Sequence, residues 1–196
     1  SPQTAGLIFG GYSPSAYLAI AESWNGSAWT EVSDMNTGRS FHGGSGISTS
    51  ALATGGYIGP YPSPTITANV EIYDGSSWTE TGDLNQTRAF VCMGGVSSTS
   101  ALAFGGEIPG PAITAVTESW DGSSWTEVND LSSAVDQHGG NGISTLALSF
   151  GGQAPSLTTA TEEFSFPPDT ASALTEGDIF LSGGTTLKGF GKLAGA

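Results

Sequence analysis

The stretch EIYDGSSWTE, residues 71–80, has the composition of a β-hairpin. Its β-branched and aromatic residues suit strands, and the Asp-Gly pair between them is typical of a two-residue type I′ turn, whose residues take positive φ angles. The same pattern returns as ESWNGSAWTE at 22–31 and as ESWDGSSWTE at 118–127. Three copies of one hairpin in one chain predict a repeated β structure.

A Gly-Gly doublet stands before each hairpin and marks the same repeat. Successive doublets lie about 45 to 50 residues apart, and between doublet and hairpin the chain varies in length and is rich in Pro, Ser and Thr. Two short segments of small and apolar residues, such as SFHGGSGIS at 40–48 and ALATGG at 51–56, which ends in the doublet, predict two further strands per repeat. The recurring positions are Gly10, Gly11, Gly55, Gly56, Gly105, Gly106, Gly151 and Gly152, with the aromatic residues Trp24, Trp29, Tyr73, Trp78, Trp120 and Trp125.

The doublet, the two aromatic residues and a following arginine together resemble the kelch motif. The first two repeats carry that arginine as Arg39 and Arg88, whereas the third has Val135 in its place. The resemblance implies an all-β, kelch-like β-propeller of about four antiparallel, four-stranded blades, the first and last incomplete. This Ser/Thr/Gly-rich version also resembles repeats in tail-associated structural proteins of marine bacteriophages.

The predicted organisation is a repeat array followed by a closing segment. The array covers residues 1–170, with units near 1–38, 39–87, 88–134 and 135–170, and residues 171–196 form a C-terminal β-hairpin or closing segment. The first unit begins at its second strand, and the last has no evident outer strand, so each end exposes a sheet edge. We expect segment 177–191 to be strand-paired and to cap such an edge, and truncation after Asp169 to give an aggregating or unfolded product. An open array completed by another subunit is the competing arrangement.

Charge limits the partners. The net charge is −14, and the basic residues are Arg39, Arg88, Lys188 and Lys192. Binding to a phosphate backbone depends on clustered cations, so nucleic acid is not an expected partner. No apolar run approaches the roughly 20 residues that span a bilayer, and we expect no membrane insertion. The first residues, SPQTAGLIFGG, indicate either a processed chain or part of a longer product.

The recurring aromatic residues and arginines have two interpretations each. The aromatic side chains could form platforms for sugars, but their regular recurrence favours packing between neighbouring sheets. Arg39 and Arg88 could hold a ligand, but their shared repeat position favours bonds to loop carbonyls or to the recurring acids.

The recurring acids and the two histidines are the remaining candidates for chemistry. Glu22, Glu71, Glu118 and Glu162, together with Asp34, Asp83 and Asp130, could hydrolyse a glycoside or bind calcium. Since a catalytic pair is normally unique and these copies are alike, structural hydrogen bonding is favoured. His42 and His138 would face each other across the axis if four blades closed, and a metal site there is the weaker alternative.

We therefore expect a non-enzymatic structural or binding module of a phage virion: a tail fibre, an appendage or a surface decoration. No catalytic, cofactor-binding or metal site is expected. The expected partners are other virion or appendage proteins, copies of the chain itself and a host-surface glycan, and the expected location is the virion surface or the extracellular space. Recognition would lie in the variable loops after the Gly-Gly doublets. The alternative is a secreted carbohydrate-active or galactose-oxidase-like enzyme domain, and an intracellular kelch adaptor is disfavoured.

Overall fold

The computed structural model describes residues 4–60, 63–153, 156–165, 179–182 and 186–189. Every regular element in these ranges is a β-strand, and they contain no helix that is long and apolar enough to cross a membrane. The chain divides into two units, Ser1–Ser165 and Phe166–Ala196. The predicted all-β class is confirmed.

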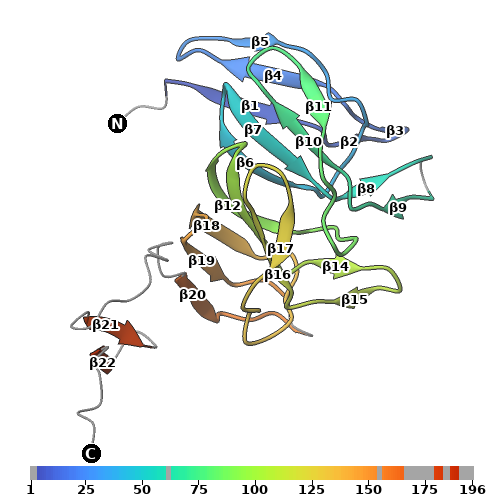
Figure 1. Ribbon diagram of the computed structural model, residues 1–196. Helices are drawn as coiled ribbons and strands as arrows, with labels where there is room; N and C mark the ends of the chain where they lie inside the picture. The colour runs from blue at the N-terminus through green and yellow to red at the C-terminus, as the bar shows by residue number, and fades with distance from the viewer. Residues whose placement is uncertain (1–3, 61–62, 154–155, 166–178, 183–185, 190–196) are drawn as a thin grey trace, which may run out of the picture. The chain divides into compact units, whose positions relative to one another are not determined.

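Four antiparallel sheets follow one another along the first unit, coloured from blue to orange in Figure 1. The first sheet has the order β1 (Gly6–Phe9), β4 (Ala21–Trp24), β5 (Trp29–Glu31). The second has the order β6 (Gly43–Ile47), β7 (Ser50–Thr54), β10 (Val70–Tyr73), β11 (Trp78–Glu80). The third has the order β12 (Cys92–Ser97), β13 (Ser100–Phe104), β16 (Thr117–Trp120), β17 (Trp125–Glu127). The fourth has the order β18 (Gly139–Ile143), β19 (Leu146–Phe150), β20 (Thr161–Ser165).

The number of strands per sheet agrees with the predicted four in the two central repeats. The two central sheets have four strands, and the first has three among the described residues, of which β1 is equivalent to the second strand of the central sheets. The fourth sheet has three strands among the described residues. Strand β12 packs beside both β6 and β18, so the inner strands of successive sheets are neighbours. No hydrogen-bonded pairing of the described strands joins the first sheet to the fourth.

The stretches after the Gly-Gly doublets are more ordered than their composition suggested. Each of the first three folds into a short two-stranded hairpin, and Figure 1 shows all three hairpins on the same side of the sheets. They are β2–β3 (Tyr12–Ser13 with Ala16–Tyr17), β8–β9 (Tyr57–Ile58 with Thr65–Ile66) and β14–β15 (Glu107–Ile108 with Ala112–Ile113).

The turn of the decisive hairpin differs from the prediction. Tyr73 pairs with Trp78, so the loop contains four residues, and of these only Gly75 has a positive φ, at 98°. The Asp74 carboxylate accepts hydrogen bonds from the backbone N–H groups of Ser76 and Ser77, at 2.8 Å each. A type I′ turn has positive φ at both central residues, so the type I′ assignment was wrong.

The second unit contains one described hairpin, in which β21 (Ile179–Ser182) pairs antiparallel with β22 (Thr186–Gly189). The predicted strand pairing near 177–191 is confirmed for these residues, and the rest of that segment lies outside the described residues. Whether the hairpin caps an edge of the array stays a prediction.

Candidate functional site

The segments that connect successive sheets, which we call connectors, each dock onto the sheet that follows. The first connector, residues 32–42, places the Arg39 side chain in a fully buried position. Its Nη1 donates to the carbonyl oxygens of Gly55 and Asn69 at 3.2 and 2.8 Å. Its Nη2 donates to Glu71 Oε1 at 2.6 Å. The other carboxylate oxygen of Glu71 accepts from the backbone N–H of Asn36 at 2.7 Å, so one buried acid binds the connector at two points.

The second connector, residues 81–91, repeats this arrangement. Arg88 is also fully buried and donates to Gly105 O, Val116 O and Glu118 Oε1 at 3.2, 2.6 and 2.8 Å. Burial lowers the pKa of Arg88, whereas the charge of Glu118 acts in the opposite direction. The prediction that the arginines bind recurring acids and loop carbonyls is confirmed.

The tryptophans fill the same interfaces from the outer hairpins. Trp78 and Trp125 are buried, and their Nε1 groups donate to Ser33 O and Gly82 O of the preceding connectors at 3.0 and 3.1 Å. Tyr73 and Trp120 are buried against them. For these four residues, packing between sheets is confirmed. Trp29 is different: it belongs to the first sheet and is 47% exposed.

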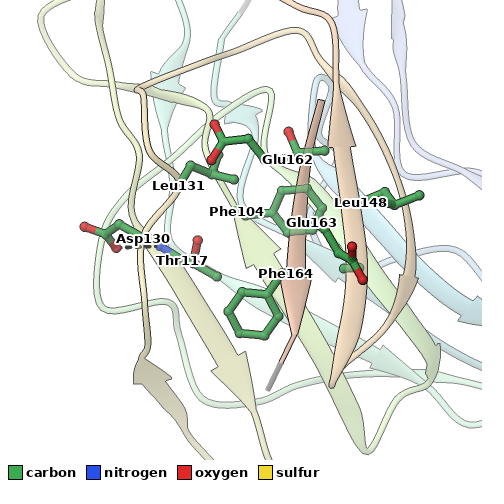
Figure 2. Close-up of a pocket in the computed structure, with 10 residues that line it drawn as sticks. Phe104, Thr117, Asp130, Leu131, Leu148, Glu162, Glu163 and Phe164 are labelled. Atoms are coloured by element: carbon green, nitrogen blue, oxygen red, sulfur yellow. Dashed lines mark hydrogen bonds between the residues drawn. The ribbon is translucent and has the colours of Figure 1, made fainter. Parts of the chain in front are cut away.

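The interface between the third and fourth sheets lacks the arginine. Val135 occupies its position and is buried, and Glu162 accepts from the backbone N–H of Ser132 at 2.7 Å. Figure 2 shows the Glu162 and Glu163 side chains on opposite sides of β20, with Glu162 directed toward the connector that carries Leu131. In the same view Asp130 accepts a hydrogen bond from the backbone N–H of Thr117, at 3.1 Å. Glu162 and Asp130 therefore both have structural contacts here.

The two histidines pack in separate interfaces. His42 lies against Phe9 with ring centroids 5.3 Å apart, and His138 lies against Phe104 at 5.6 Å. Burial, with a smaller contribution from Arg39, lowers the pKa of His42 to about 4. Burial also lowers the pKa of His138, against the charge of Asp136. No group of three potential metal ligands occurs among the described residues.

A set of four aromatic rings, which we call the aromatic strip, lies where the connectors meet the short hairpins. Phe41 stacks on Phe90 with centroids 4.6 Å apart and lies 5.6 Å from Tyr12. Tyr57 meets the edges of Phe41 and Phe90 at 5.8 and 5.9 Å. Tyr12 is 57% exposed and Phe41 42% exposed, so the strip presents apolar rings to solvent.

The backbone holds two of these rings in an unfavourable conformation. Phe41 and Phe90 have φ angles of 52° and 51°, a left-handed region in which bulky residues are rare. Such strain persists only where the surroundings impose it, and it concentrates at functional sites. Here the Phe90 N–H donates to Phe41 O at 2.7 Å, which ties the two connectors together.

One end of the strip is polar. In the third repeat, Glu107 stands where Tyr12 and Tyr57 stand, and Gln137, also at a φ of 51°, takes the place of the phenylalanines. Tyr57 donates its hydroxyl to Glu107 Oε1 at 2.9 Å, and burial together with Glu107 raises its pKa to about 12. The strip therefore ends in a neutral phenol and a carboxylate.

The strip has a signal in the sequence that lies outside the kelch motif. A tyrosine follows two of the Gly-Gly doublets directly, and a phenylalanine follows each arginine by two positions. The sugar-platform hypothesis concerned the aromatic residues of the hairpins, of which Tyr73, Trp78, Trp120 and Trp125 are buried.

Comparisons with known proteins add no assignment. No protein-family model matches the chain, and no curated protein is similar enough to be matched.

Proposed function

We propose that this chain is a non-enzymatic structural and binding module of a bacteriophage virion, in a tail fibre, an appendage or a surface decoration, and that its aromatic strip recognises a host-surface glycan. In this proposal the four sheets are blades of a kelch-like β-propeller. The sequence resemblance described above supports the assignment, and the antiparallel sheets of the structure are compatible with it.

The aromatic strip is the observation that carries the binding role. The apolar C–H faces of pyranose rings pack on aromatic rings, and the hydroxyl groups around them need donors and acceptors nearby. Tyr12 and Phe41 offer exposed rings, and Tyr57 and Glu107 offer polar groups at one end. Phe41, Phe90 and Tyr57 pack on one another, and these contacts restrict the rings before any ligand arrives, which lowers the entropy lost on binding.

Two glutamates and the cysteine, which are residue types that can serve in catalysis, lie outside the aromatic strip. Glu71 and Glu118 are buried in ion pairs with arginines, and burial raises the pKa of the Cys92 thiol to about 11, so this thiol is protonated at neutral pH. A binding role at the aromatic strip is compatible with the structural contacts of these glutamates and with a protonated Cys92.

The test is an array of bacterial surface polysaccharides, followed by titration of any bound glycan. Phe41→Gly removes a ring while keeping a residue that tolerates the left-handed φ. We expect this variant and Tyr12→Ala to bind at least about tenfold more weakly than the wild type, since each loses a stacking contact. Trp29→Ala, which removes an exposed ring outside the strip, is the matched control and should bind normally. Binding that both strip variants retain in full would exclude the strip as the glycan site.

A further inference from the structure

The interface between the third and fourth sheets has counterparts of the residues that surround the buried arginine in the other two interfaces, although Val135 stands at the arginine position. We call this set of residues the cradle and define it by Ser132, Ser133, Val135, Gly151, Ala160 and Glu162, which together line one pocket. They correspond one for one to Asn36, Thr37, Arg39, Gly55, Asn69 and Glu71 of the first interface.

The backbone of the cradle has the same hydrogen bonds as the arginine-filled interfaces. Gly151 donates to Ala160 O at 2.9 Å, as Gly55 donates to Asn69 O at 3.0 Å. The Val135 carbonyl accepts from Gly106 at 2.8 Å, the same distance as from Gly11 to the Arg39 carbonyl. Even the left-handed φ is kept, at 67° for Gly151 and 65° for Gly55.

The acceptors of a guanidinium group are therefore in place. In the filled copies two carbonyl oxygens and one carboxylate oxygen receive the arginine, and their counterparts here are Gly151 O, Ala160 O and Glu162 Oε1. Glu162 Oε2 binds Ser132 N, and Oε1 accepts no hydrogen bond from the described residues. Glu162 is half-buried, so a cation can reach it from solvent.

We propose that the cradle binds the guanidinium group of an arginine that belongs to a partner protein. A planar fork of N–H donors satisfies three separated acceptors better than a compact ammonium does. A second copy of the chain is not the donor, because its two arginines, Arg39 and Arg88, are fully buried in their own interfaces. The proposal is independent of glycan binding, since the cradle and the aromatic strip share no residue.

The test uses methylguanidinium as the probe and follows backbone amides by NMR. In the full chain, the amides of Ser132, Val135 and Gly151 should shift saturably at millimolar concentrations. Glu162→Gln removes the charge and should weaken binding at least about tenfold. Val135→Arg supplies the guanidinium internally and should abolish binding while raising the melting temperature. Glu163→Gln, on the other side of β20, is the matched control and should bind as the wild type does.

Two further arms separate the sources of the cation. Methylammonium should bind more weakly than methylguanidinium, and equal binding would contradict a site shaped for a fork. In the double variant Lys188→Ala/Lys192→Ala, unchanged affinity supports an external arginine, whereas increased affinity would mean that the chain's own lysine occupies the cradle and would overturn the proposal. Equal shifts in the wild type, Glu162→Gln and Val135→Arg, or no saturable shift at all, would also overturn it.

Discussion

Arg39 and Arg88 show how single residues specify the contact between sheets. Each is fully buried, lies 2.6 or 2.8 Å from a buried glutamate, and is also bound by two carbonyl oxygens. A buried charge is costly unless it is paired and hydrogen-bonded. The pair therefore selects one arrangement of connector and sheet, because any displacement would leave two charges buried without partners.

Replacing Arg88 with Met should lower the free energy of unfolding by about 3–5 kcal/mol, because it leaves the buried carboxylate of Glu118 uncompensated. Urea denaturation measures the loss, and Glu127→Gln, an exposed acid on the neighbouring strand, serves as the control with little expected change. The double variant Arg88→Met/Glu118→Leu should recover part of the stability. If the single variant unfolds at the wild-type midpoint, the pair does not stabilise this interface.

His42 should make the stability depend on pH. Its pKa is about 4 in the folded state and 6.5 as the ordinary value, so the unfolded chain takes up the proton first. The stabilisation is present in full above pH 6.5 and is lost as the pH falls toward 4, by about 3 kcal/mol. Urea denaturation at several pH values between these limits measures the slope. His42→Gln should flatten the slope, although part should remain because the pKa of His138 is lowered as well. Equal slopes in variant and wild type would contradict the assignment.

At the scale of elements, equivalent hairpins differ in what covers them. The β10–β11 hairpin of the second sheet packs on the first sheet, where Tyr73 and Trp78 join a cluster with Ala21 and Met35. In the β4–β5 hairpin of the first sheet, Trp29 lies against Trp24 and is 47% exposed. The two hairpins have similar sequences, but their contributions to stability differ because a preceding sheet covers only β10–β11 in the part of the chain that the structure describes.

Trp78→Ala should cost about 3–5 kcal/mol, because it opens a cavity in a packed interface and removes the Nε1 bond to Ser33 O. Trp29→Ala, at the matching position, should change the free energy of unfolding by less than about 1 kcal/mol, as exposed positions do. Thermal melts followed by circular dichroism compare the two variants. Equal losses would show that both rings are buried in solution and that the first sheet is covered there.

At the scale of the whole molecule, the first and fourth sheets each expose half of the interface that recurs between the sheets. The first presents Ile8 and Trp29, 52% and 47% exposed, at positions equivalent to the buried Ala53 and Trp78. The fourth presents Leu148, 44% exposed, at a position equivalent to the fully buried Leu52. Such complementary faces permit head-to-tail contact between two copies, which leads to a ring or a filament.

We therefore expect self-association that depends on concentration, measured by sedimentation equilibrium. Trp29→Glu and Leu148→Glu should each reduce it, since each places a charge in the apolar contact. A mixture of the two variants should form dimers only, because each variant keeps one intact face. A wild-type chain that stays monomeric at every concentration tested would rule out this contact.

The repeat, the all-β class and the outer hairpins could be predicted from the sequence, because strand alternation and turn residues act over a few positions. The sequence also indicated the right partner types for the arginines, since a recurring buried cation needs recurring acceptors. Three features could not be predicted in this way: Arg39 binds Glu71 of the next sheet, Trp78 is buried while Trp29 is not, and Phe41 and Phe90 adopt positive φ angles. These outcomes depend on which face of one sheet meets the next, and that contact joins residues more than 30 positions apart in the chain.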